Sequence, residues 1–316
     1  MVPSRPILLQ MSPFSDYLDS GLAARFDVLR WDGLDPAARE AWLRDHAASV
    51  RAIATAGHVG CEPGLLAALP SLRIVAINGV GVDKVDLALA KSRGVRVSTT
   101  PGTLGEDVAD LAVGLTIALL RTIPAADAYV RAGHWESRGE WPLARKVTGR
   151  RFGILGLGSI GAALAARLAP FGAVAYCGPT RKAVPYQFHA DVLSLARASD
   201  VLLVTCPANA STRRLVGREV FDALGPAGYV VNVARGAVVD EQALVEALES
   251  GRLAGAALDV FEAEPRVPEA LRSSPRVVLT PHVASATHET RLRMADLVLA
   301  NLDAVMAGRE PPTAVV

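Results

Sequence analysis

Short apolar runs alternate with longer segments of helical periodicity along the whole chain. In the first hundred residues these runs are Ile7–Leu9, Ala52–Thr55, Arg73–Asn78 and Val95–Ser98. A second, more evenly spaced series comprises 151–156, 173–177, 201–205, 229–233, 256–260 and 277–280. Such alternation is typical of βαβ units, whose strands form a parallel sheet. We therefore predict an α/β fold in which a small unit precedes a complete doubly wound unit.

Two longer segments are predicted to be helices that connect these units. Glu106–Arg121 is strongly apolar and rich in Leu and Ala, which indicates a buried helix between the two series of strands. Thr287–Ala307 carries apolar residues at helical spacing with charges between them. We expect this second helix to return the chain to the first unit.

Length and composition are sufficient for two cores and make several classes of protein improbable. The chain has 316 residues, 51% of them hydrophobic, and a formal charge of +1 without a long basic run. We therefore expect neither a nucleic-acid nor a membrane partner. Cys61, Cys177 and Cys206 form no C-x-x-C pair, which argues against a disulfide framework or a metal site. No apolar run reaches membrane-spanning length, so we expect a cytoplasmic protein.

A glycine-rich turn marks a candidate nucleotide site. The sequence Gly156-Leu157-Gly158-Ser159-Ile160-Gly161 follows the apolar run 152–155 and precedes the helix-like stretch 162–168. In this setting Gly156 permits a tight turn, Gly158 lets the backbone approach a pyrophosphate, and Gly161 permits close packing of helix and strand. The amides at the start of the helix would bind the phosphates. We predict a dinucleotide site; a glycine turn without a ligand is the alternative.

The segment after the next run favours NADPH over NADH. An enzyme that binds NAD carries Asp or Glu where the run 174–177 ends, because a carboxylate accepts the ribose hydroxyls. This chain has Gly178-Pro179-Thr180-Arg181-Lys182 there instead. Arg and Lys can bind the extra 2′-phosphate of NADPH through charge-assisted hydrogen bonds. An ordinary solvated loop remains the alternative, and NADH the alternative cofactor.

Four charged or titratable residues follow apolar runs of the second series. They are Arg235, Asp259, Glu264 and His282. Ligands of parallel sheets bind beyond the carboxyl ends of the strands, so these side chains are expected to converge. Reduction of a 2-oxo acid needs a cation at the carboxylate, an acid for the developing alkoxide, and a group that keeps this acid charged. Arg235, His282 and Glu264 match these roles in that order.

The motifs together resemble the D-isomer-specific 2-hydroxyacid dehydrogenase family. From Phe152 to Val316 the chain has the family's glycine turn, arginine segment 232–240, acidic segment 258–265 and Pro-His segment 281–282, in that order. The stretches 78–83 and 100–102 extend the resemblance to nearly the whole chain. Within the family, 221–226 and 282–287 are most similar to glyoxylate/hydroxypyruvate reductases and hydroxyphenylpyruvate reductases.

The resemblance implies two Rossmann-like domains with doubly wound parallel sheets. The cofactor domain, 99–284, would be inserted into a flavodoxin-like substrate domain made of 1–98 and 285–316. The resemblance also implies a homodimer formed largely through the cofactor domains. The segment Trp135–Trp141 would then either reach a neighbouring active site or supply aromatic anchors to the dimer interface.

The resemblance assigns further residues to the site. Arg235, Glu264 and His282 would be catalytic, and the backbone amides of Val80 and Gly81 would hold the substrate carboxylate. Ser285 would lie near the substrate, Asp259 at the nicotinamide carboxamide, and Cys206-Pro207 at the adenine. The cofactor set is completed by Gly156, Gly158, Ser159, Ile160, Gly161, Thr180, Arg181, Lys182, Thr212, Val233, Ala234 and His282. These reductases usually carry Arg where Pro179 stands here, so 2′-phosphate binding rests on Thr180, Arg181 or Lys182.

The sequence thus predicts an NADPH-preferring reductase of small 2-oxo acids, such as glyoxylate and hydroxypyruvate, with His282 as the general acid and a D-2-hydroxy acid as product. Two alternatives remain: an NAD-dependent dehydrogenase of D-lactate or phosphoglycerate type, and a non-catalytic regulator that senses a dinucleotide. The sequence does not determine the side chain of the substrate, and hydroxyphenylpyruvate or 2-ketogluconate would also be consistent with these motifs.

Overall fold

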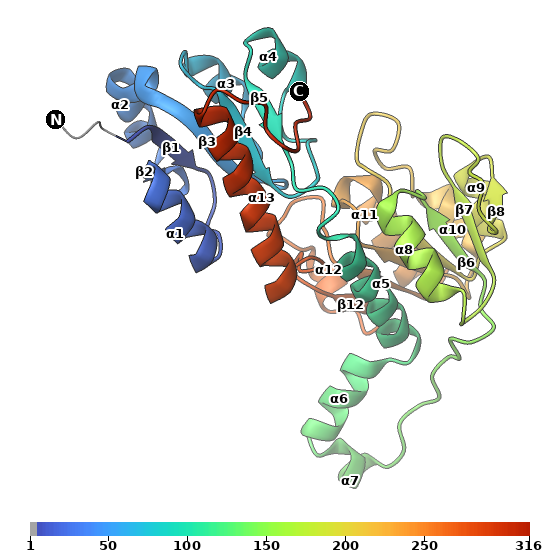
Figure 1. The fold of residues 1–316 in the computed structure, drawn as a ribbon. Helices are drawn as coiled ribbons and strands as arrows, with labels where there is room; N and C mark the ends of the chain where they lie inside the picture. Colours follow the sequence, from blue (N-terminus) through green and yellow to red (C-terminus); the bar gives the residue numbers. More distant parts are fainter. Residues whose placement is uncertain (1–4) are drawn as a thin grey trace. The chain divides into compact units, whose positions relative to one another are not determined.

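The structure is a computed structural model that describes residues 5–316 and divides into two compact units (Figure 1). The first unit comprises the chain up to Leu104 together with Ala286–Val316, and the second comprises Gly105–Ser285. The predicted domain bounds, 99–284 for the cofactor domain and 1–98 with 285–316 for the substrate domain, stay a prediction.

The first unit contains a parallel sheet of five strands in the order β2-β1-β3-β4-β5. The strands are β1 (Ile7–Gln10), β2 (Asp27–Arg30), β3 (Val50–Ala56), β4 (Ile74–Asn78) and β5 (Arg96–Ser98). This is the strand order of flavodoxin-like folds, which confirms the predicted class of the unit.

Helices cover both faces of this sheet because alternate strand residues point to opposite sides. Leu8 packs with helices α1 (Asp16–Arg25) and α13 (His288–Met306) on one face. Leu9 faces the other side, which carries α2 (Pro36–His46), α3 (Pro63–Ala68) and α4 (Leu87–Ser92). The short helices η1 (Trp31–Gly33) and η2 (Ala47–Ser49) flank α2. Since α13 belongs to the first unit, the prediction that this helix returns the chain there is confirmed.

The second unit contains a parallel sheet of seven strands in the order β12-β11-β10-β9-β6-β7-β8. The strands are β6 (Phe152–Leu155), β7 (Val174–Cys177), β8 (Gln187–His189), β9 (Val201–Val204), β10 (Tyr229–Asn232), β11 (Gly255–Leu258) and β12 (Val277–Leu279). Counted from its own first strand the order is 3-2-1-4-5-6-7, the Rossmann arrangement with one added strand. The predicted doubly wound fold is therefore confirmed.

Helices also cover both faces of this second sheet. On one face, α5 (Gly105–Leu120) and α8 (Ser159–Leu168) pack against each other. The other face carries α9 (Val192–Arg197), α10 (Arg218–Leu224) and α11 (Glu241–Glu249) around one large apolar core. Two short helices, η3 (Gly236–Val238) and α12 (Glu269–Arg272), lie in the loops after β10 and β11.

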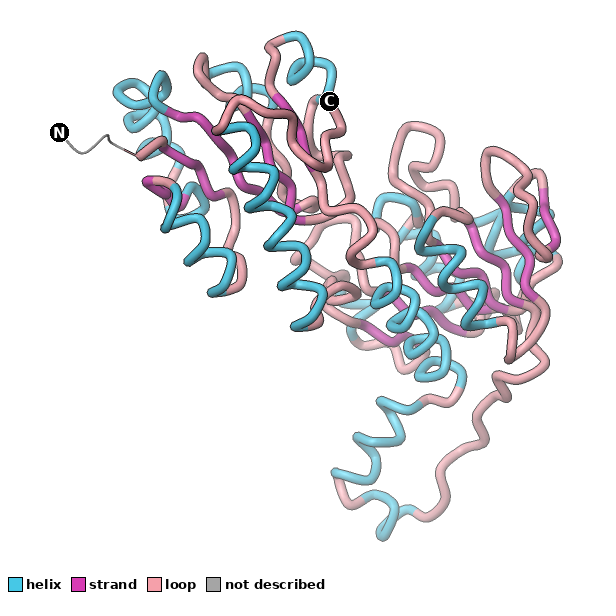
Figure 2. Tube along the Cα trace, in the orientation of Figure 1, coloured by secondary structure: helices cyan, strands magenta, loops and turns pink. Residues whose placement is uncertain are grey.

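The segment between α5 and β6 forms an arm that extends away from the rest of the second unit (Figure 2). It contains α6 (Ile123–Arg131) and α7 (His134–Arg138), neither of which buries a residue. Among residues 5–316 no single helix has the length and apolarity to span a membrane. The pair α5 and α6, bent by 62°, passes that test only when its two helices are taken together.

Two strands, β2 and β8, were not predicted from the sequence. Each is one of the two edge strands of its sheet and is partly exposed, so neither has the continuous apolar run that marked the central strands. In β8 the apolar anchor is Phe188, whose ring lies 5.4 Å from that of Tyr176.

Candidate active site

The glycine turn lies between β6 and α8, beside the point where the strand order of the second sheet reverses. Gly156 has a φ of +100°, and a Cβ added there would lie 2.8 Å from Cα of Cys206. A Cβ on Gly161 would overlap the carbonyl oxygen of Gly156. Both positions therefore need glycine for the fold itself.

At Gly158 the fold itself does not require glycine. A Cβ built at Gly158 would meet no atom within 4 Å, so it faces open space. Gly158 is also the N-cap of α8 and supplies no capping side chain. This leaves the first turn of α8, which includes Ser159 and Ile160, open to an anionic group. The residues present thus fit the pyrophosphate of a dinucleotide.

The basic segment after β7 reaches the glycine turn through one lysine. The ammonium group of Lys182 donates a hydrogen bond to the carbonyl oxygen of Leu157, inside the turn. The Lys182 backbone N–H donates to the Tyr176 hydroxyl at 2.6 Å, which fixes the start of the lysine side chain. Thr180, Arg181 and Lys182 are all exposed. Of the three candidates for the 2′-phosphate, the structure places Lys182 at the turn.

The loop after β9 borders the turn on its other side. Cys206 is buried, and burial raises the pKa of its thiol to about 11, so it stays protonated. The Thr212 hydroxyl donates to the carbonyl oxygen of Pro207 at 2.7 Å and accepts from the backbone N–H of Asn209 at 2.8 Å. Thr212 therefore shapes the loop that carries Pro207.

The loop after β10 is held by Asn232, a residue that the sequence analysis did not assign to the site. Its side chain is fully buried, accepts from the Ala234 backbone N–H at 3.0 Å and donates to the Arg235 carbonyl oxygen at 3.0 Å. These bonds position Arg235 just beyond the buried residues Val233 and Ala234. A polar residue at the end of an otherwise apolar strand was the available signal for Asn232.

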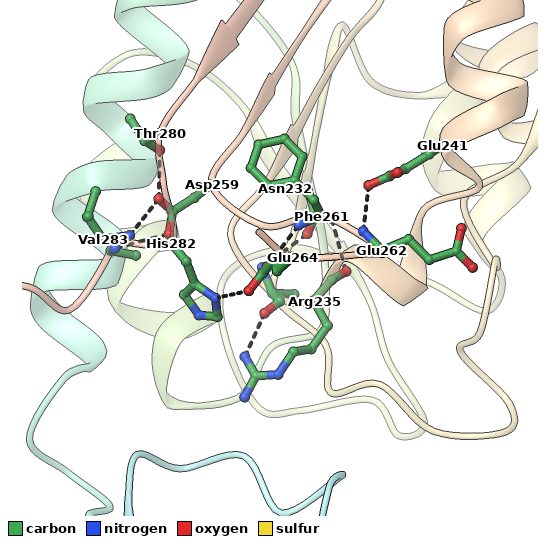
Figure 3. Close-up of polar contacts among 12 residues, drawn as sticks. Asn232, Arg235, Glu241, Asp259, Phe261, Glu262, Glu264, Thr280, His282 and Val283 are labelled. Carbon is green, nitrogen blue, oxygen red and sulfur yellow. Dashed lines mark hydrogen bonds and ion pairs between the residues drawn. The ribbon is translucent and has the colours of Figure 1, made fainter. Parts of the chain in front are cut away.

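His282 and Glu264 form the central pair of the site (Figure 3). Nδ1 of His282 lies 2.8 Å from Oε2 of Glu264, and the two side chains are 30% and 22% exposed. An ionised carboxylate can only accept, so the hydrogen of this bond belongs to Nδ1. The other Glu264 oxygen, Oε1, accepts the Phe261 backbone N–H at 2.9 Å. Both oxygens of Glu264 are thereby oriented.

Arg235 lies in the same cluster. Figure 3 shows its guanidinium below the side chains of Glu264 and His282 in this view. One guanidinium nitrogen donates to the Ala234 carbonyl oxygen at 2.7 Å. The structure therefore brings together the three residues predicted to be catalytic, from the loops after β10, β11 and β12.

Asp259 orients the loop that carries His282. Its side chain is fully buried. Oδ1 accepts hydrogen bonds from the Thr280 hydroxyl at 2.6 Å and from the Val283 backbone N–H at 2.9 Å. Oδ2 accepts a hydrogen bond from the Ala284 backbone N–H at 3.0 Å. The His282 backbone N–H donates to the Asp259 carbonyl oxygen at 2.8 Å. His282 has a φ of +54°, which non-glycine residues rarely adopt. The predicted contact of Asp259 with nicotinamide stays a prediction.

Glu241, the first residue of α11, is a second site neighbour that the sequence analysis missed. Its side chain is buried, and its Oε1 accepts the Glu262 backbone N–H at 2.6 Å. Burial raises the pKa of Glu241 above its ordinary value, and the nearby carboxylates of Glu262 and Glu264 raise it further. Glu241 directly follows the N-cap Asp240 in the sequence, and nothing in that pattern distinguishes it from a solvated residue of a first helical turn.

The remaining predicted substrate residues lie in separate loops. In the first unit, Val80 and Gly81 follow β4, and Val80 is 40% exposed. In the second unit, Ser285 is partly buried next to Ala284. No group of three or more His, Cys, Asp or Glu residues within 5–316 is arranged to hold a metal ion.

The comparisons with known proteins agree on one family. A family model described as D-isomer specific 2-hydroxyacid dehydrogenase, NAD binding domain, matches residues 113–284. A glyoxylate/hydroxypyruvate reductase A of Arabidopsis thaliana is 47% identical over 312 residues, which cover 98% of each chain. The hydroxyphenylpyruvate reductase of Plectranthus scutellarioides is 47% identical over 311 residues, again 98% of each chain.

A solved structure with a bound cofactor is similar over nearly the whole chain. It is an NADPH-dependent glyoxylate/hydroxypyruvate reductase from Sinorhizobium meliloti in complex with NADP and malonate. Its sequence is 42% identical, its TM-score is 0.90, and the match covers 99% of this chain and 97% of that one.

Proposed function

Because this chain belongs to the D-isomer-specific 2-hydroxyacid dehydrogenase family, we propose that it is an NADPH-preferring reductase of small 2-oxo acids. Glyoxylate and hydroxypyruvate are the proposed substrates, and the products are 2-hydroxy acids, of D configuration where the carbon is chiral. The observation that carries this proposal is the bond between His282 and Glu264 next to Arg235, at the carboxyl edge of a dinucleotide-binding sheet.

The protein residues supply the acid and the charge that the reaction needs. Bound NADPH supplies the hydride that adds to the carbonyl carbon of the substrate. Arg235 binds the substrate carboxylate and polarises the carbonyl bond. His282 gives a proton to the carbonyl oxygen as it becomes a hydroxyl, which completes the reduction of C=O to CH–OH. Glu264 holds Nδ1 of His282, so that the opposite ring nitrogen, Nε2, faces the substrate.

The proposed cofactor contacts follow the loops described above. The glycine turn and the first turn of α8 hold the pyrophosphate, and Lys182, with Thr180 or Arg181, holds the 2′-phosphate. The loops at Cys206-Pro207, Thr212 and Val233-Ala234 line the remainder of the proposed cofactor site. Asp259 and His282 lie at its nicotinamide end. The segment after β7 contains no carboxylate that would favour NADH.

Two amides and a hydroxyl complete the proposed substrate site. We assign the backbone N–H groups of Val80 and Gly81 to the substrate carboxylate, since consecutive amides beside glycines form an anion-binding nest. Ser285 is assigned to the vicinity of the substrate. These residues set few limits on the substrate side chain, so hydroxyphenylpyruvate and 2-ketogluconate belong in any test.

Initial rates with a panel of 2-oxo acids test the proposal. We expect reduction of glyoxylate and hydroxypyruvate, with NADPH giving at least about a tenfold higher kcat/KM than NADH. Equal or faster rates with NADH would identify an NAD-dependent dehydrogenase instead. Tight NADPH binding without reduction of any acid in the panel would favour the dinucleotide-sensing regulator, for which the His282–Glu264 pair serves no purpose.

We further propose that the protein is a homodimer formed through the second unit. The arm around α6 and α7 exposes three large apolar side chains, Val130 (55%), Trp135 (64%) and Leu143 (101%), and exposed aromatic and apolar residues of this kind are common in interfaces. Trp141 is already engaged within the arm, where its indole N–H donates to the Thr122 hydroxyl at 3.1 Å. Trp135 is therefore the better candidate to reach a neighbouring subunit.

A cytoplasmic location is also part of the proposal. Cys61, Cys177 and Cys206 are all free and buried, as is common for proteins of reducing compartments. No nucleic-acid or membrane partner is proposed.

A further inference from the structure

A buried carboxylate outside the proposed acid–base pair contacts the loop that carries Glu264. Glu241 is 8% exposed, and its Oε1 accepts the Glu262 backbone N–H at 2.6 Å (Figure 3). The side-chain charges that act on it, Glu262 and Glu264, have its own sign. Burial of a carboxylate beside like charges costs free energy, so its position calls for a function.

The helix itself does not require Glu241. The N-cap of α11 is Asp240, whose carboxylate accepts the Ala243 N–H at 3.1 Å. Asp240 thus already satisfies an amide of the first helical turn. The carboxylate of Glu241 points instead to the Phe261–Glu262 peptide, whose N–H it accepts.

That peptide is confined from a second direction by Gly236. A Cβ added to Gly236 would overlap the carbonyl group of Phe261 and the nitrogen of Glu262. The backbone of Gly236 therefore packs directly on this peptide while Glu241 holds its N–H. The Glu262 side chain is tied separately, through an ion pair of 3.0 Å with Arg214.

The orientation of the peptide bears on Glu264 because Phe261 links the two. The backbone N–H of Phe261 donates to Oε1 of Glu264 at 2.9 Å, and Oε2 of the same carboxylate lies 2.8 Å from Nδ1 of His282. A rotation of the Phe261–Glu262 segment would therefore move the Glu264 carboxylate relative to the imidazole.

We propose that Glu241 is a positioning residue: its carboxylate fixes the Phe261–Glu262 peptide, and thereby sets the Glu264 oxygen that holds His282. The inference rests on the proposed function, since it concerns the orientation of the proposed proton donor. Glu241 itself acts through Glu264 and needs no contact with the substrate.

Two substitutions distinguish this role from a general effect on the fold. Glu241→Ala removes the acceptor, whereas Glu241→Gln keeps a side-chain oxygen that can accept the Glu262 N–H. Glu249→Ala, an exposed carboxylate at the end of the same helix, is the matched control. We expect Glu241→Ala to lower kcat by about tenfold or more, with KM and NADPH-binding stoichiometry unchanged, because misplaced groups slow the chemical step. Glu241→Gln should restore most of the activity.

A second measurement needs no turnover. A proton on Nδ1 that is bonded to a carboxylate resonates far downfield in proton NMR, and the loss of this signal in His282→Ala assigns it. We expect the signal in wild type, Glu241→Gln and Glu249→Ala, and its loss or shift in Glu241→Ala.

Several results would overturn the inference. One is a Glu241→Ala variant with wild-type kcat and an unchanged NMR signal. Another is a Glu241→Gln variant whose kcat and NMR signal are the same as those of Glu241→Ala. A parallel loss of NADPH stoichiometry and activity would mean a purely structural role. If the wild-type protein reduces no 2-oxo acid, the proposed function itself fails, while the NMR comparison still reports whether Glu241 orients the His282–Glu264 pair.

Discussion

Asp259 holds the loop that carries His282. Its two carboxylate oxygens accept three donors from the loop that carries His282, and its own carbonyl oxygen accepts a fourth. His282 has a left-handed backbone conformation, which is costly for a residue with a side chain. We infer that the bonds to Asp259 offset this cost, so that the imidazole is presented in one orientation.

The substitution Asp259→Asn tests this interpretation at the level of one residue. An amide oxygen can replace Oδ1, but the amide NH₂ would then face the Ala284 N–H, so that two donors meet in a buried site. We expect a loss of about 1–3 kcal/mol in the free energy of unfolding, measured by denaturant titration. The exposed Glu249→Gln is the control. A variant as stable as wild type would mean that the loop does not depend on these bonds.

At the scale of elements, a pair of charges joins the starts of two central strands. Asp200 lies just before β9, and Arg151 lies just before β6. The Asp200 carboxylate accepts hydrogen bonds from the backbone N–H of Arg151 at 2.9 Å and from its guanidinium at 2.7 Å. Burial opposes ionisation of Asp200, but the hydrogen bonds and charge of Arg151 outweigh it and lower the pKa of the carboxyl. A lowered pKa in the folded state means that ionisation favours folding.

This pair predicts a pH-dependent difference in stability. The contribution of Asp200 is present above about pH 4, the ordinary value for Asp, and is lost as the pH falls through the lower pKa of the folded state. We therefore expect Asp200→Asn to be less stable than wild type at neutral pH, with the difference shrinking in acid. Denaturant titrations across that range measure it. A difference that is constant with pH would exclude ionisation as its cause.

The sequence was sufficient for the elements whose residues are buried on both sides. Strands such as β9 and β10 have four consecutive buried residues, and helix α13 was recognised from its spacing. The edge strands β2 and β8 were missed because exposed positions interrupt their apolar pattern. Apolar periodicity reports burial, and no residue of β2 or β8 is fully buried.

The site residues divide in a similar way. Arg235, Glu264 and His282 were predicted because charged residues after buried strands have few structural roles. Asn232 and Glu241 were not, since their partners lie in backbone that only the folded chain brings near them. Hydrogen bonds between a side chain and a distant peptide leave no periodic trace in the sequence.

At the scale of the whole molecule, the exposed apolar arm predicts the oligomeric state. We expect a dimer in sedimentation equilibrium. The double variant Val130→Glu with Leu143→Glu should raise the dissociation constant of the dimer by at least about tenfold, because charges buried in the interface oppose association. Leu292→Glu, at a 46% exposed position of α13, is the control. A monomeric wild type, or a double variant that dimerises equally well, would contradict the proposed interface.

We propose that His282 donates the proton during reduction of a 2-oxo acid, and the substitution His282→Ala removes this donor. The measurement is single-turnover and steady-state reduction of the best substrate by NADPH, beside the dissociation constant of NADPH. We expect a fall in turnover of about a hundredfold or more, with NADPH binding retained, as is usual for loss of a positioned general acid. Turnover that is unchanged in His282→Ala would contradict it.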